Sequence, residues 1–223
     1  MSKRSCWIGG ILAAVTVCLT LQAKTFPEIR AAAEKGDADA QFELGIYYSV
    51  GICVKMDEAT AKKWYLKAAD QGHVAARSTC LSEGYGVEKD LEKAGEVARQ
   101  AAETGDPWGQ FCMGTYYGVK AAPEQSIRWF RKAADQGNGW AQVFLGMGYL
   151  GIMKGAPEDP EQAFFWLKKA AEQGNAMGQI LLGGCYISGT GVPKDREKAA
   201  YWLRQAAEQG CEQAKAALKK LEQ

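Results

Sequence analysis

The residues that could do chemistry in this chain are few and scattered. His73 is the only histidine, and it directly precedes a predicted helix, where capping the helix is the simpler role for it. Neither a second histidine nor a CxxC pair accompanies it, so the sequence offers no recognisable zinc site. The segment GTGVPK at 189–194 looks like a phosphate loop but lacks the Gly-Lys-Ser/Thr ending. We therefore predict no catalytic residues, no metal site and no cofactor.

Cysteines are the other reactive side chains. The chain holds seven, and five of them follow position 23: Cys53, Cys80, Cys112, Cys185 and Cys211. An odd number of cysteines in an exported protein predicts at least one free thiol or an intermolecular bond.

The first 23 residues have the pattern of a secretory signal peptide. Lys3 and Arg4 precede a short apolar run that ends at Gln22 and Ala23, and cleavage is expected after Ala23. An uncleaved membrane anchor is the alternative, although the run is short for a bilayer span. We expect an exported protein, periplasmic or secreted, with no membrane span after cleavage. Its net charge of +1 lacks the basic excess that nucleic-acid binding requires.

The predicted helices, which would position any functional site, form a repeat. A pair of alanines followed shortly by glycine recurs, with the glycines at positions 36, 72, 105, 137, 174 and 210. Each glycine can end a helix in the left-handed conformation, and the residue after it is mostly a good N-cap for the next helix. This period predicts an all-α superhelix, or solenoid, of about five helical hairpins. The predicted units are 37–72, 73–105, 106–137, 138–174 and 175–210, with a helix at 24–36 before them and a capping helix at 211–223 after them.

Two further columns recur inside the units. The first helix carries Leu-Gly-x-x-Tyr, as at Leu44-Gly45 and Tyr48, and a glycine inside a helix predicts close approach of a neighbour. The second helix begins after an aspartate such as Asp57 or Asp195 and carries an aromatic column at Trp64, Trp129, Trp166 and Trp202. Helical spacing favours a place in the core for these tryptophans.

These motifs together resemble the Sel1-like repeat, a branch of the tetratricopeptide (TPR-like) superfamily. The resemblance covers about residues 37–210 and implies a right-handed superhelix that serves as a scaffold or adaptor for proteins or peptides. Some members staple each hairpin with a disulfide, but the matching alanine pairs here are not cysteines. A bond between Cys80 and Cys112 is possible, while burial of both as small apolar residues is the favoured alternative.

A binding surface is predicted on the first helices, where two columns four residues apart vary between units. One column holds Glu43, Thr79, Cys112, Phe144 and Leu181, and the other holds Tyr47, Glu83, Tyr116, Gly148 and Cys185. The candidate partner-binding residues are Glu43, Tyr47, Thr79, Glu83, Tyr116 and Phe144, with the tyrosines as the expected anchors. Packing of these columns between neighbouring first helices is the alternative.

Two functions follow. The first is a non-enzymatic scaffold that binds a protein or peptide partner, with no nucleic acid. The second is a cell-envelope hydrolase acting on β-lactams or wall material, an activity attributed to some cysteine-rich relatives. A hydrolase needs a nucleophile beside a base, and the sequence indicates none, so the scaffold is the prediction.

Overall fold

The computed structural model describes residues 24–223, and the predicted signal peptide at 1–23 lies outside them. Twelve α-helices and no strands make up this described part. Their bounds are α2 Phe26–Glu34, α3 Ala38–Val50, α4 Glu58–Asp70, α5 Val74–Glu83, α6 Leu91–Glu103, α7 Pro107–Val119, α8 Pro123–Asp135, α9 Gly139–Tyr149, α10 Pro160–Glu172, α11 Ala176–Ser188, α12 Arg196–Glu208 and α13 Glu212–Leu221. Consecutive helices pack on each other, so the predicted solenoid of helical hairpins is confirmed. None of the helices from α2 to α13 has the length and apolarity needed to cross a bilayer.

The local signals that divide the chain behave as the sequence predicts. Each glycine of the repeated column has a positive φ, for example 99° at Gly36 and 91° at Gly210, which favours a residue without Cβ. Except after Gly210, the residue that follows each of these glycines caps the next helix, and His73 does so by accepting the amide of Ala76 on Nδ1 at 3.2 Å. Asp57 caps the second helix, as Asp90, Asp159 and Asp195 do in three other units. Backbone conformation and capping therefore set the length of each unit.

In four of the five units, a glycine inside the first helix makes room for one large side chain of the second helix. A Cβ on Gly45 would lie 2.5 Å from the ring of Tyr65, and one on Gly146 would lie 2.6 Å from Leu167. Gly114 and Gly183 face Phe130 and Leu203 in the same way. In the second unit the large and small residues are exchanged: Leu81 of the first helix occupies the position of the glycine, and Ala98 of the second helix occupies the position of the large side chain. Close approach of two helices is thus the reason for the recurring glycine.

The predicted tryptophan core is only partly correct. Trp166 is buried with 2% of its surface exposed, whereas Trp64, Trp129 and Trp202 are only half-buried. The column that fills the core lies one residue later, at Tyr65 and its equivalents, because those side chains fill the space above the glycines. Trp64 and Trp129 instead lie beside lysines, and Lys132 Nζ is 4.0 Å from the ring centroid of Trp129.

Two neighbouring glycines in α11 offer a direct test of this packing. A Cβ on Gly183 would lie 2.9 Å from Leu203 Cγ, while one on Gly184 would meet nothing within 4 Å. We expect Gly183→Ala to lower the free energy of unfolding by about 2 kcal/mol through overpacking. Gly184→Ala should raise it by about 1 kcal/mol, because alanine favours the helix. Urea unfolding followed by circular dichroism checks both, and equal effects of the two changes would contradict the proposed contact.

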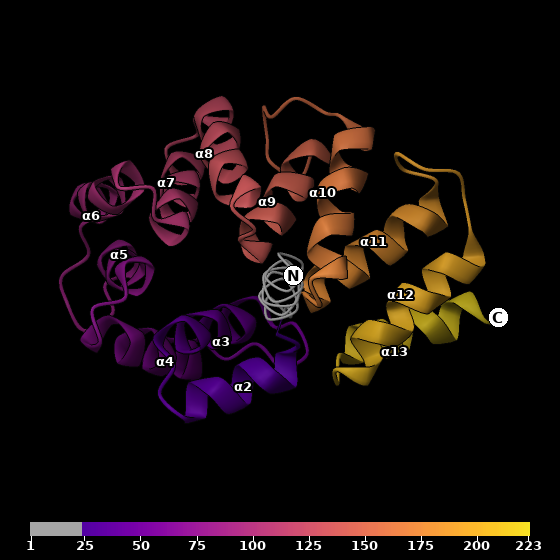
Figure 1. Ribbon diagram of the computed structural model, residues 1–223, viewed down its shortest axis with the longest axis horizontal. Coiled ribbons are helices and arrows are strands. Elements are labelled where there is room, and N and C mark those ends of the chain that lie inside the picture. Colours follow the sequence, from indigo (N-terminus) through magenta and orange to yellow (C-terminus); the bar gives the residue numbers. More distant parts are fainter. Residues whose placement is uncertain (1–23) are drawn as a thin grey trace, which may run out of the picture.

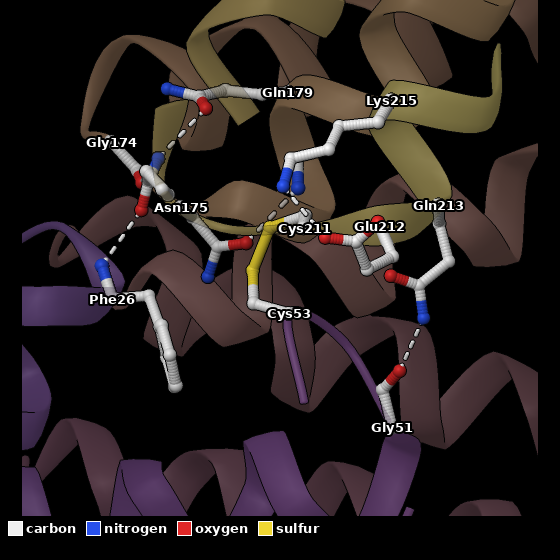
Figure 2. The surroundings of a disulfide bond; sticks show 12 residues. Phe26, Gly51, Cys53, Gly174, Asn175, Gln179, Cys211, Glu212, Gln213 and Lys215 are labelled. Carbon is white, nitrogen blue, oxygen red and sulfur yellow. Dashed lines mark hydrogen bonds and ion pairs between the residues drawn. A yellow bond between two sulfur atoms is a disulfide. The ribbon is translucent and has the colours of Figure 1, made fainter. Parts of the chain in front are cut away.

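The superhelix curves so that its two ends come close together (Figure 1). The helices α3, α5, α7, α9 and α11 lie on the inside of the curve, and the second helices lie outside. A disulfide joins Cys53, in the turn after α3, to Cys211, directly before α13, across 158 residues of sequence (Figure 2). Two hydrogen bonds lie beside it: Phe26 N donates to Gln209 Oε1 at 2.7 Å, and Gln213 Nε2 donates to the carbonyl of Gly51. The ends of the superhelix are therefore held together covalently and by polar contacts.

Both cysteines of this bond replace a residue that the repeat prefers. Cys53 has a φ of 58° at the place in the turn where the other units have Gly86 and Gly191. Cys211 occupies the N-cap of α13 and makes no side-chain capping bond, whereas the five first helices begin after aspartate, asparagine or histidine. Each replacement weakens the local structure, and the bond between them offsets that loss.

A recurring glutamine joins successive units, and the sequence interpretation missed its role. Gln41 Nε2 donates to the carbonyl of Ala33 at 3.1 Å, and Gln71 Nε2 donates to Gln41 Oε1 at 2.7 Å. Gln179 and Gln209 repeat this pair in the last unit at 2.8 Å. Gln41, Gln179 and Gln209 are buried, and their amides satisfy carbonyls at or just after the ends of preceding helices. Gln209 also accepts a hydrogen bond from the backbone N–H of Phe26, at the other end of the superhelix.

Candidate functional site

Two neighbouring cavities lie on the inner helices. The first, here called the apolar cavity, has a volume of about 190 Å³ and is lined mainly by residues of α3, α5, α7 and α9, together with Tyr65 of α4 and Leu91 and Ala94 of α6. The second, here called the acidic cavity, has a volume of about 380 Å³. Phe42 lines the apolar cavity and Trp108 lines the acidic one, and their ring centroids are 5.0 Å apart. This aromatic pair therefore separates the two.

The apolar cavity contains four of the six predicted partner-binding residues: Thr79, Glu83, Tyr116 and Phe144. Its walls are mainly aromatic and aliphatic, and the ring of Phe144 packs at 5.5 Å from that of Phe111. Its hydroxyl groups are largely committed to the protein itself: Ser78 and Thr115 each donate to a backbone carbonyl. Glu83 is exposed and is the only charged residue on the wall. The cavity therefore suits an apolar side chain beside a positive charge.

Tyr116 is held at the edge of this cavity by the second unit. Its ring covers Gly95 of α6, where a Cβ would lie 2.5 Å away. Its hydroxyl donates to Glu92 at 2.8 Å, and Lys120 forms an ion pair with the same carboxylate. The bond to Glu92 raises the pKa of the Tyr116 hydroxyl. Tyr116 remains half-exposed, so its ring is available to a partner in a fixed orientation.

The other two predicted residues, Glu43 and Tyr47, line the acidic cavity. Tyr47 is fully buried, with its ring centroid 4.8 Å from Phe26 and 5.1 Å from Trp140. It thus packs across the inside of the curve, between the first unit and α9, and its ring is not accessible as an anchor. Neither sequence alternative described this place, since the columns were expected to face a partner or an adjacent first helix.

Glu43 is the half-buried carboxyl of the acidic cavity. Loss of hydration raises its pKa to about 7. Lys24 and the indole of Trp140 favour the charged form, while the carboxylates of Asp37 and Asp39 oppose it. Lys24 itself is paired with Asp37 at 2.9 Å. Glu43 therefore changes its charge near neutral pH.

Three cysteines of the described part of the chain, Cys80, Cys112 and Cys185, are free and buried. No bond joins Cys80 to Cys112, which supports the interpretation that both pack as small apolar residues. Burial raises the pKa of the Cys80 thiol to about 11 and that of Cys112 to about 12. Thiols this weakly acidic are poor nucleophiles at neutral pH. Among residues 24–223, no group of three or more His, Cys, Asp or Glu side chains is arranged to hold a metal ion.

Comparison with known proteins agrees with the repeat. The Sel1 repeat model matches residues 38–73, 75–106, 109–138, 141–175 and 176–211. A protective antigen of uropathogenic Escherichia coli with an SLR fold is 35% identical, with a TM-score of 0.57 over 88% of this chain. The match spans only 44% of that protein.

A Sel1 repeat protein from Oxalobacter formigenes is 29% identical, also with a TM-score of 0.57, over 83% of this chain and 76% of its own. A comparison with curated protein sequences finds no match. Five matched repeats cover most of the described residues, and the helices fold as such repeats do. The chain belongs to the Sel1 repeat family.

Proposed function

We propose that this protein is an exported, non-enzymatic scaffold that binds a protein or peptide partner in the apolar cavity. The observation that carries the proposal is that Thr79, Glu83, Tyr116 and Phe144 line one cavity on the inner helices. These positions differ from unit to unit, so the repeat does not need their identities for its own packing. Sel1-repeat proteins typically act in protein interactions, which supports the same function.

Export is supported by two independent features. One is the basic and then apolar pattern of residues 1–23. The other is the Cys53–Cys211 disulfide, because such bonds persist mainly in oxidising compartments. Cell fractionation and mass spectrometry of the purified chain test this part. We expect the protein outside the cytoplasm with Lys24 as its first residue.

The binding proposal is tested by filling the apolar cavity. The wild-type mature chain is used to isolate its partner from the native cells, and the affinity of the purified pair is then measured. Thr79→Trp should weaken binding by about tenfold or more, since an indole occupies the space of the ligand. Lys63→Trp, on the exposed face of α4, is the matched control and should bind as the wild type does.

Circular dichroism should give the same helicity for both variants. Binding that survives Thr79→Trp, or that is lost in Lys63→Trp alone, would place the partner elsewhere. Labelling of one serine by a penicillin-like covalent probe would instead support the hydrolase.

A further inference from the structure

The acidic cavity presents a row of polar side chains from one face of α3. Asp39, Glu43 and Tyr47 are four residues apart and all line it. Trp140 of α9 and Trp108 of α7 also line it, so aromatic rings and carboxylates share the wall. Its volume of about 380 Å³ lies within the range of small-ligand pockets.

Two buried donors in this wall have no hydrogen-bond partner. Trp140 is 2% exposed and Tyr47 is fully buried, yet neither the indole N–H nor the phenolic oxygen makes a hydrogen bond of normal geometry. The indole does lie close enough to Glu43 to favour the charged form of that carboxyl. Leaving such a group unpaired costs free energy, and most buried polar groups in proteins are satisfied. The indole can only donate, whereas the phenol can donate and accept. A ligand that supplies an acceptor would therefore satisfy the indole of Trp140.

The carboxylates indicate the other half of the ligand. Asp37 is paired with Lys24, and Asp39 lies 3.1 Å from His73 Nε2. Within residues 24–223, Glu43 has no such ion pair, and its pKa is raised because its charge is poorly solvated. A cation beside it would relieve that cost, and the rings of Trp108 and Trp140 add cation–π attraction. An anionic ligand would face repulsion from Asp39 and Glu43.

We propose that the acidic cavity binds an α-ammonium group and the carbonyl next to it, as in a free amino acid or the amino terminus of a peptide. The ammonium pairs with Glu43 and donates a hydrogen bond to the Tyr47 oxygen, and the carbonyl oxygen accepts the indole N–H of Trp140. A lone amine would leave the indole unpaired, and a blocked amino terminus would leave Glu43 without its cation. This site does not depend on the partner proposed for the apolar cavity.

Titration calorimetry of the mature, oxidised chain at neutral pH tests the proposal. The probes are trialanine, N-acetyl-trialanine and free L-alanine. Trialanine should bind saturably, and its acetylated form should bind about tenfold more weakly or worse, as expected for loss of a charged hydrogen bond. Comparable binding of L-alanine would identify amino acids as a source of the ligand, and much weaker binding would identify peptide termini.

Variants assign the contacts. Glu43→Gln should weaken trialanine binding by about tenfold, and Trp140→Phe, which keeps a ring but removes the N–H, should weaken it severalfold. Glu83→Gln in the apolar cavity is the matched control and should leave binding unchanged. Equal binding of both tripeptides, equal binding by Glu43→Gln, or no saturable binding of trialanine by the folded wild type would overturn the proposal. Glutamine has nearly the same volume as glutamate, so Glu43→Gln should fold as the wild type does. Its result therefore tests the proposal even where Trp140→Phe does not fold.

Discussion

Reduction of the Cys53–Cys211 disulfide should lower the free energy of unfolding by roughly 5 kcal/mol. The bond links residues 158 positions apart. A cross-link over a loop of this length lowers the conformational entropy of the unfolded chain, which raises the free energy of that state by about this amount. The two cysteines also sit where the repeat prefers glycine and an N-cap residue, so the reduced protein keeps their local cost. Urea unfolding with and without a thiol reductant, followed by circular dichroism, measures the difference.

Two double variants separate the stability contributed by the disulfide from the stability lost by placing cysteines at positions 53 and 211. Cys53→Ala with Cys211→Ala removes the bond and keeps a poor turn residue and a poor cap. Cys53→Gly with Cys211→Asn also removes the bond but restores the residues that other units use. We expect the second pair to be more stable than the first by about 2 kcal/mol, from the turn and the cap together. Identical unfolding midpoints for oxidised and reduced wild type would show that the bond contributes nothing.

Replacement of Glu43 by glutamine should stabilise the protein by about 3 kcal/mol above neutral pH. The folded state keeps the Glu43 proton up to a pKa of about 7, against an ordinary value of 4.5. Between these values unfolding releases a proton, so wild-type stability falls as the pH rises through this window. Glutamine has no proton to lose, and its stability should therefore not show this fall.

The measurement is the free energy of unfolding of both proteins from pH 4 to pH 8. Lys24, Asp37, Asp39 and the neighbouring His73 are present in both, so the difference between the two curves isolates Glu43. Glu83→Gln, a change of the same kind at an exposed site, should follow the wild-type curve. Parallel curves for wild type and Glu43→Gln would mean that Glu43 is well hydrated in the folded protein.

The units could be predicted because their signals are local. Left-handed glycines such as Gly36 and caps such as Asp57 act within one turn of backbone. The glycine at Gly45 correctly predicted a close helix contact, but the contacting residue was not the neighbouring leucine or tyrosine of the same helix. It is Tyr65 of the second helix, and only the pairing of the two helices in space identifies it.

The closure of the superhelix could not be predicted in the same way. It results from small rotations between units that add up over the whole chain, and no segment of sequence encodes their sum. The burial of Tyr47 against Trp140 has the same origin. A signal was nevertheless present, since Cys53 and Cys211 break the repeat at two positions where a cysteine is locally unfavourable. Such paired exceptions indicate a long-range bond.

The joined ends also restrict how this protein can change in evolution. An open array gains or loses a hairpin readily, because each hairpin touches only its neighbours. Here an inserted hairpin would carry the turn of Cys53 away from the start of α13, and the covalent bond and its flanking hydrogen bonds would be lost together. The number of hairpins is therefore fixed by the need to bring the two ends together.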